Sequence, residues 1–267
     1  MSLSEEKNLN ESSELNSDTQ KSSSEESASV NNEEPVDDGT MPLTAHLQEL
    51  RSRLIKSILA IVVGSCISYF FLDDIMHYLT LNVGKLYYMK PGEAFFTYIK
   101  IDIAAGFLIA LPVIFYHAWR FFLPALTAAE RMVLGIIVPA SVLLFFIGLA
   151  FSFFLVLPVA LKFFIGFGDE NLQAMFSFGN YFDFVVMFLL PFGFIFELPL
   201  IIIVLGKIGI LTSEWLKKYQ RIVIFLSFVI GAIITPTPDV FTQSMIALPM
   251  ILLYEIGYLV LRYILRK

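Results

Sequence analysis

Long apolar stretches alternate with short polar connections along most of the chain. Six such stretches can be recognised, at residues 55–72, 103–118, 133–161, 184–205, 222–235 and 240–261. A helix of about 20 apolar residues crosses the ~30 Å hydrocarbon core of a bilayer. The pattern therefore predicts an all-α membrane protein with six transmembrane helices.

The six stretches differ in length, which indicates that the helices are not straight and parallel. The third has 29 residues and no charge, so as a helix of about 44 Å it must tilt, bend or project from the bilayer. The fifth has only 14 residues. Proline, which tends to bend a helix, occurs inside the stretches at Pro112, Pro139, Pro158, Pro191, Pro199 and Pro249. We expect a curved layer of helices with a concave, cup-like side and short fifth and sixth helices.

The segment before the first apolar stretch divides the chain into two parts. Residues 1–40 hold eleven carboxylates, two lysines and almost no large apolar side chain, so they cannot bury enough surface to offset the entropy of ordering. We expect a disordered acidic tail there and a membrane domain over residues 41–267. Within residues 41–54, four leucines form a stripe at helical spacing: Leu43, Leu47, Leu50 and Leu54. The stripe predicts a short amphipathic helix on the cytoplasmic membrane surface, leading into the first span.

Lysine and arginine are distributed unequally between the two sides of the predicted layer. Outside the acidic tail, twelve lie on the side of the two chain ends and four on the other side. Cytoplasmic connections carry the excess of these residues. We therefore expect a multi-pass protein of the cell membrane with both termini in the cytoplasm.

The composition excludes a soluble domain and most kinds of cofactor site. Apolar residues make up 57% of the 267 and charged residues 16%, with a mean hydropathy of +0.74. The single cysteine, Cys66, rules out a disulfide framework and cysteine-based zinc or iron–sulfur sites. No zinc-binding histidine pair, Gly-rich phosphate loop or nucleophile elbow occurs, and no signal-peptide pattern stands at the start. We expect neither an enzyme nor a bound cofactor or metal.

Glu197 is the most unusual charged residue of the apolar stretches. It stands 14 residues into the fourth, which has 22 residues, and a lipid-facing charge there costs roughly 2.5–3.5 kcal/mol on insertion scales. It must therefore face a cavity, a partner helix or water, or be hydrogen-bonded within the protein as a packing carboxyl. Pro199, two residues later, favours a bend at this point.

Glu49 and Glu130 are further candidates, and each also has an ordinary structural explanation. Glu49 can pair with Arg53 one turn later, and Glu130 completes a Thr-x-x-Glu capping box with Thr127. Both lie, however, on the predicted cytoplasmic face, which is otherwise basic. Together they could form a docking point for a cationic ligand.

Two more carboxylates have mainly structural explanations. Asp239 follows a Thr-Pro-Thr-Pro run and can cap the sixth helix on the outer side. Glu255 in the last stretch can extend toward the arginines near the C-terminus.

Several motifs resemble those of one family of membrane proteins. They occur in order at residues 44–54 (Thr-Ala-His-Leu-Gln-Glu-Leu-Arg-Ser-Arg-Leu), 95–100 (Phe-Phe-Thr-x-Ile-Lys), 119–131, 196–199 (Phe-Glu-Leu-Pro), 237–243 (Thr-Pro-Asp-Val-Phe-Thr-Gln) and 249–257. Together they cover residues 44–262, whereas residues 81–90 depart from the pattern. The chain resembles TatC, the polytopic receptor subunit of the twin-arginine protein translocase.

The resemblance implies a receptor for signal peptides that carry paired arginines. It implies that two cytoplasmic carboxylates recognise these arginines and that three further residues shape the same site. The carboxylates are Glu49 and Glu130, and the other three residues are Arg51, Phe121 and Pro124. This assignment fits the chemistry, because guanidinium groups bind carboxylates bidentately whereas lysine does not.

The resemblance also implies partners and an energy source. Glu197 would contact the helix of a single-span subunit of TatA or TatB type, and Asp239 and Gln243 would matter for assembly on the outer face. Several copies would assemble in the receptor complex, with no nucleic acid partner, and the proton-motive force would drive the export of folded proteins.

The competing interpretation is a small ion-coupled transporter in which Glu197 carries a proton. Such transporters usually show repeats with broken helices in corresponding halves. No internal repeat is evident here, because the two halves differ in span length and in the placement of charge.

Overall fold

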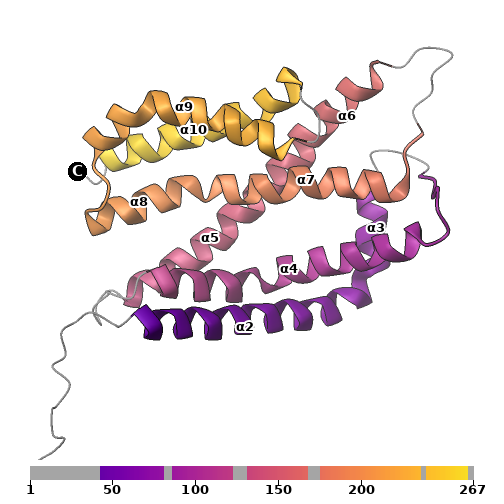
Figure 1. Ribbon diagram of the computed structural model, residues 1–267, viewed down its shortest axis with the longest axis horizontal. Helices are drawn as coiled ribbons and strands as arrows, with labels where there is room; N and C mark the ends of the chain where they lie inside the picture. Colours follow the sequence, from indigo (N-terminus) through magenta and orange to yellow (C-terminus); the bar gives the residue numbers. More distant parts are fainter. Residues whose placement is uncertain (1–42, 81–85, 123–130, 168–174, 236–238, 264–267) are drawn as a thin grey trace, which may run out of the picture. The chain divides into compact units, whose positions relative to one another are not determined.

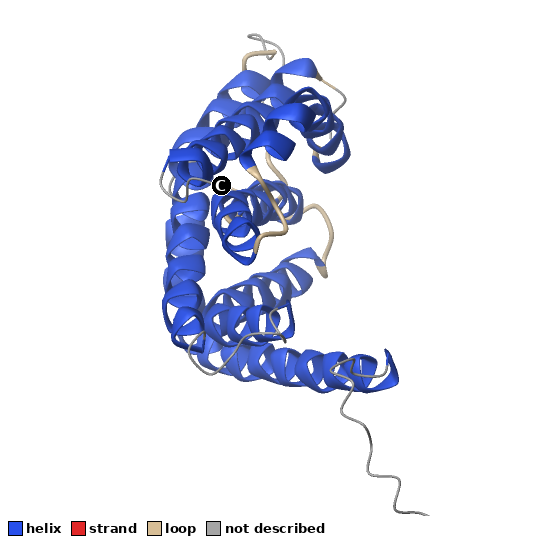
Figure 2. Ribbon diagram, turned by 90° about the vertical axis from the view of Figure 1, so that its left-hand side faces the viewer, coloured by secondary structure: helices blue, strands red, loops and turns tan. Residues whose placement is uncertain are grey.

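The described part of the chain consists of helices joined by connections (Figure 1). The computed structural model describes residues 43–80, 86–122, 131–167, 175–235 and 239–263, without the side chains of residues 43–46, 122 and 131–134. The helices are α2 (Leu43–Ser68), η1 (Tyr69–Phe71), α3 (Leu72–Thr80), α4 (Glu93–Phe122), α5 (Arg131–Phe151), η2 (Ser152–Val156), α6 (Leu157–Ile165), α7 (Phe178–Phe196), α8 (Leu198–Ile208), α9 (Ser213–Ile234) and α10 (Val240–Tyr263). Figure 2 shows helices and loops but no strand among these residues.

The predicted all-α fold is confirmed, with five apolar spans and a sixth helix among the described residues. Five segments are long and apolar enough to cross a membrane: Leu47–Thr80, Glu93–Phe121, Gly135–Ile165, Phe178–Ile208 and Val240–Tyr263. The remaining helix is α9, whose first turns are charged and precede the apolar residues from Ile222 onward. With 22 and 24 residues, α9 and α10 are shorter than the other spans, which have 29 to 34.

Helix α9 is longer than its apolar stretch because a cap and good helix formers extend it. Thr212 is the N-cap, and its side chain accepts a hydrogen bond from the Trp215 backbone N–H at 3.3 Å. The following lysines and arginine have high helix propensity. The helix therefore starts nine residues before the predicted stretch of residues 222–235.

The third and fourth apolar stretches are interrupted, at places where their length and prolines predicted a bend. The third contains the π-helical turn η2, after which Pro158 is the second residue of α6. The fourth is interrupted at Glu197, and Pro199 is the second residue of α8. In the first turn of a helix, proline lacks only a donor that would have no intrahelical partner. The other four prolines lie within continuous helices.

The predicted surface helix of residues 41–54 is not separate from the first span. It forms the first part of α2, which continues to Ser68. No glycine or proline occurs in residues 43–63 to end the helix. Within the leucine stripe, Leu50 and Leu54 are 41% and 57% exposed, so the described residues leave it largely uncovered.

Helices of the larger compact unit pack in a series. This unit is Gln48–Lys267, and the other, Met1–Leu47, is described only for the first residues of α2. Helix α4 packs against α5 and α7, α7 packs against α10, and α10 packs against α8 and α9. Helix α2 runs along α4 in the opposite direction (Figure 1). Within this unit the helices form a curved layer, as predicted (Figure 2).

Phenylalanine side chains fill the middle of the layer between α5 and α7. Phe145 on α5 and Phe192 on α7 are both fully buried. Phe145 makes an edge-on contact with Phe194 at 5.3 Å between ring centroids, and Phe151 contacts Phe192 at 5.7 Å. Without a hydrophobic driving force in lipid, such close packing is a main source of attraction between helices.

Glycines allow the closest approaches between helices. A Cβ added to Gly64 on α2 would collide with the Gly106 carbonyl on α4, and a Cβ on Gly106 would lie 2.7 Å from Ser65 Cα. Because both obstacles are backbone atoms, neither can move aside as a flexible side chain would. These two glycines therefore set the distance between α2 and α4.

We expect Gly106→Ala to destabilise the protein by about 1–3 kcal/mol through overpacking, although alanine favours a helix over glycine by about 1 kcal/mol. Gly135→Ala in α5 is the matched control, because nothing lies within 4 Å of its added Cβ. Thermal unfolding in detergent, followed by tryptophan fluorescence, measures both. Equal midpoints for the two variants would contradict this account of the α2–α4 contact.

Candidate functional site

The start of α2 and the end of α4 bring several charged side chains together, and we call residues 49–56 and 117–121 the basic end. Glu49 forms an ion pair with Arg53, one turn later in α2. Arg53 also donates a hydrogen bond from Nη1 to the His117 carbonyl oxygen on α4 at 3.3 Å. The ordinary explanation for Glu49 is therefore present, and Arg53 also links the two helices.

The basic end carries a clear excess of positive charge. Glu49 is the only acid in its sequence, against Arg51, Arg53, Lys56 and Arg120. The His117 ring is exposed to the electrostatic repulsion of three cations, Lys56, Arg53 and Arg120. A lone carboxylate in such surroundings is the one group there that attracts a cation.

The other residues predicted for this site are only partly described. Arg51 is exposed on α2, and Phe121 is half-buried in the last turn of α4. Pro124 and Glu130 lie outside the described residues. The structure thus puts Glu49, Arg51 and Phe121 at one end of the layer, and it does not test their proximity to Glu130.

Glu197 lies at the interruption between α7 and α8, with its side chain covered. The residue is 4% exposed, and neither carboxyl oxygen has a hydrogen-bond partner of normal geometry among the described residues. The polar group that interacts with the Glu197 carboxyl is the hydroxyl of Ser141 on α5. Of the surroundings expected for this carboxyl, the described residues provide a neighbouring helix, α5. Leaving a buried acceptor unpaired costs about 1–3 kcal/mol.

Ser141 also bonds to a side chain of α4. Its Oγ accepts a hydrogen bond from Trp119 Nε1 on α4 at 2.8 Å, and Ser141 is fully buried. Sequence reasoning did not single out Ser141, because a lone serine in an apolar stretch can equally bond to its own helix backbone.

The two residues predicted at the outer side have structural contacts at the start of α10. Asp239 Oδ1 accepts hydrogen bonds from the Thr242 backbone N–H at 2.7 Å and from the Thr242 hydroxyl at 2.8 Å, so the predicted cap is confirmed. Gln243 Nε2 donates to the Phe228 carbonyl oxygen at 2.7 Å and thereby ties α10 to α9.

Glu255 contacts the neighbouring helix α9. Its Oε1 accepts a hydrogen bond from Gln220 Nε2 on α9 at 2.6 Å, and no ion pair to an arginine is found for it in the described part of the chain. This contact was not predicted, and Arg266, one of the arginines near the C-terminus, lies outside the described residues.

Sequence reasoning missed Glu93, which fixes the start of α4. Its Oε1 accepts from the Ser177 hydroxyl and from the Gly179 backbone N–H at 2.8 Å, at the start of α7. Its Oε2 accepts from the backbone N–H groups of Met89 at 2.7 Å and Lys90 at 3.2 Å. A glutamate directly after Pro-Gly at a helix start was the available signal.

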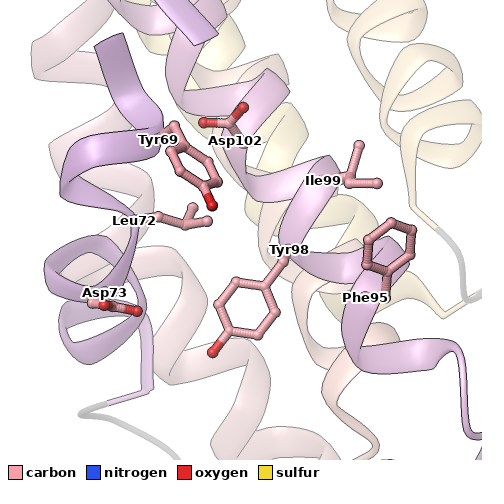
Figure 3. A pocket seen from close by; sticks show the side chains of 7 residues that line it. All are labelled: Tyr69, Leu72, Asp73, Phe95, Tyr98, Ile99 and Asp102. Atoms are coloured by element: carbon pink, nitrogen blue, oxygen red, sulfur yellow. The ribbon is translucent and has the colours of Figure 1, made fainter. Parts of the chain in front are cut away.

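A pocket of about 430 Å³ between η1, α3 and α4 was also not predicted (Figure 3). Its lining consists of Tyr69, Leu72, Asp73, Phe95, Tyr98, Ile99 and Asp102. Asp102 Oδ1 is buried without a hydrogen-bond partner in the described part of the chain. Carboxylates beside aromatic rings suit a cationic group, although no group of three candidate metal ligands occurs among the described residues.

Comparisons with known proteins agree with this arrangement. The profile of one family, Sec-independent protein translocase protein (TatC), matches residues 45–249. Proteins of that name include one from Aquifex aeolicus, 44% identical over 225 residues that cover 81% of this chain and 93% of the relative. Another, from Carboxydothermus hydrogenoformans, is 36% identical over 233 residues, which cover 86% and 96%. The Escherichia coli K12 protein is 36% identical over 235 residues, which cover 85% and 91%.

Solved structures show the same fold. A crystal structure of the twin-arginine translocase receptor TatC matches with a TM-score of 0.72 at 40% identity, covering 81% of this chain and 98% of that one. A second, in DDM, gives 0.73 at 41% identity and covers 80% and 98%. Because the profile spans most of the chain and these relatives are matched over nearly their whole length, this chain belongs to the TatC family of Sec-independent protein translocase proteins.

Proposed function

We propose that this chain is the signal-peptide receptor of a twin-arginine translocase, and that the paired arginines of the peptide dock at the basic end. The observation that carries the proposal is that the Glu49 side chain stays partly exposed while it is paired with Arg53. Its side chain is 34% exposed, whereas that of Arg53 is 12% exposed. A carboxylate offers about four acceptor positions, so an incoming guanidinium can bind Glu49 while Arg53 keeps its bond to α4.

The remaining predicted residues complete this proposed site. Glu130 supplies a second carboxylate for the second arginine, and Arg51, Phe121 and Pro124 shape its border. If the site had no carboxylate, its cations would repel the positively charged peptide. Recognition then requires the guanidinium geometry and not positive charge alone.

The proposed orientation follows from the same charges. Lysine and arginine are concentrated at the basic end and in the first turns of α9, and such residues are retained in the cytoplasm. Both termini are then cytoplasmic, in a multi-pass protein of the cell membrane. The acidic residues 1–40 precede the motifs, and we propose that they take no part in transport.

We further propose that Glu197 and a nearby groove receive a single-span partner of TatA or TatB type. The groove has about 410 Å³ and is lined by apolar side chains of α7 to α10: Leu190, Pro191, Phe194, Ile195, Leu198, Ile230, Ile234 and Met250. The Glu197 carboxyl would turn from Ser141 to a polar side chain of the partner. The lack of a hydrogen-bond partner for it among the described residues supports this role.

Assembly and energy supply complete the proposal. Asp239 and Gln243 hold the start of α10 at the outer face, where copies of the chain would meet within the receptor complex. Export of folded cargo would draw on the proton-motive force, because the sequence contains no nucleotide-binding motif.

Charge reversal tests the peptide site. We expect Glu49→Lys, and likewise Glu130→Lys, to weaken binding of an Arg-Arg signal peptide by about tenfold or more, because a hydrogen bond to a charged group contributes about 1.5–3 kcal/mol. Fluorescence anisotropy with purified full-length protein measures the affinity. The control is Glu214→Lys, the same charge change at an exposed acid in α9. Unchanged binding by both test variants would refute the assignment.

Replacement of Glu197 tests the partner site. Glu197→Ala removes an unpaired buried carboxyl, so we expect the protein to be at least as abundant but to co-purify less of the single-span partner. Glu197→Gln should retain part of that association. The control is Glu255→Ala, which removes a carboxyl already bonded to Gln220. Cross-links from position 197 only to this chain's own helices, with normal export by Glu197→Ala, would reduce Glu197 to a packing role.

Deletion of residues 2–38 tests the division of the chain. We expect export of a twin-arginine cargo to continue at the normal rate, since the motifs begin at Thr44. Export is measured as mature cargo outside the cytoplasm, with the amount of the shortened protein in the membrane as control. Loss of export despite normal membrane levels would show that the tail participates.

A further inference from the structure

A second groove runs along the junction of α2 and α4 and opens at the basic end. It has a volume of about 400 Å³, and its larger lining side chains include Lys56, Leu59 and Val63 from α2 and Ile109, Val113 and His117 from α4. Helix α2 lies beside α4 over this length (Figure 1). Lys56 and His117 lie at the same end, because Arg53, one turn before Lys56, contacts the His117 carbonyl.

The walls of this groove are apolar and uncovered. Leu59, Val63, Ile109 and Val113 are between 41% and 62% exposed, although they belong to two candidate membrane spans. From Lys56 the α2 wall extends to Ile67. The rise along a helix from residue 56 to residue 67 is about 16 Å. This is close to half of the ~30 Å thickness of the hydrocarbon core. The groove therefore has the depth of one leaflet.

The open end of the groove is positively charged. Lys56 is exposed and has no ion-pair partner among the described residues. Arg120, also exposed, is directed to the Tyr116 hydroxyl at 2.9 Å. The one carboxylate of the basic end, Glu49, is already paired with Arg53. An anion at this end would therefore meet Lys56 and the His117 ring, and Glu49 is the one acid that the described residues 49–56 and 117–121 place there.

We propose that this groove binds an anionic phospholipid, with the phosphate at Lys56 and His117 and one acyl chain along the apolar walls. Two observations select this occupant: the charge of the open end complements a phosphate, and the groove has the depth of one leaflet. The proposal does not depend on signal-peptide binding. It needs only that this end of α2 and α4 lies at a membrane surface.

Lipid binding to the purified full-length protein in detergent, measured by native mass spectrometry, tests the headgroup. We expect phosphatidylglycerol to bind more tightly than phosphatidylcholine. Lys56→Gln should weaken phosphatidylglycerol binding about fivefold, the contribution of one basic side chain near a membrane surface. The control is Lys217→Gln, the same change at an exposed lysine of α9, which should bind like the unaltered protein. Inorganic phosphate should not displace the lipid, because it lacks the acyl chain.

A matched pair of tryptophan substitutions tests the apolar part. Val62 and Val63 are each 53% exposed, but only Val63 lines the groove. Val63→Trp should fill the groove and reduce phosphatidylglycerol binding at least fivefold, whereas Val62→Trp should leave it unchanged. The proposal is overturned by equal binding of the two lipids, by equal effects of the two glutamine variants, or by equal effects of the two tryptophan variants. It is also overturned if Val63→Trp weakens only Arg-Arg peptide binding, since the groove then belongs to the peptide.

Discussion

Polar contacts between otherwise apolar helices fix how this layer is assembled. Within lipid there is no water to satisfy a polar side chain, so each must find a partner in the protein. Arg53 bonds to a carbonyl of α4, Trp119 bonds to Ser141 on α5, and Gln220 bonds to Glu255 on α10. Apolar packing alone allows a helix to take several rotations about its own axis against its neighbour. A hydrogen bond allows few of them, because its donor and acceptor must face each other. These contacts therefore select one arrangement among many apolar ones.

Glu197 is one exception to this constraint, and Asp102 in the pocket beside α3 is another. Glu197 is buried beside α5, yet its oxygens have no hydrogen bond of normal geometry among the described residues. It also lies where α7 ends and α8 begins. Natural proteins tend to break local rules at functional positions. Its neighbour in sequence, Leu198, lines an apolar groove, and this is why our proposal connects the carboxyl to a partner subunit.

In our two proposals, the charged side chains of the basic end bind a positively charged ligand at one position and a negatively charged ligand at another. The partly exposed carboxylate of Glu49 lies among several cations, and in our proposal it receives a guanidinium. About two turns further along α2, Lys56 has no ion-pair partner among the described residues, and in our proposal it receives a phosphate. Peptide and lipid would thus be selected by neighbouring groups of the same two helices, and the Arg53 link keeps those groups at a fixed separation.

Features that depend on neighbouring residues in the chain were determined by the sequence. These include the six helices, the interruptions of the long spans, the Glu49 ion pair and the cap at Asp239, because hydropathy, proline and i,i+4 or i,i+3 spacing act locally. The partners of Glu255, Ser141 and Glu93 were decided only by the tertiary structure. In a soluble helix the apolar face marks the core, but in lipid both the buried and the exposed faces are apolar. The sequence therefore could not specify which face of each helix meets its neighbour.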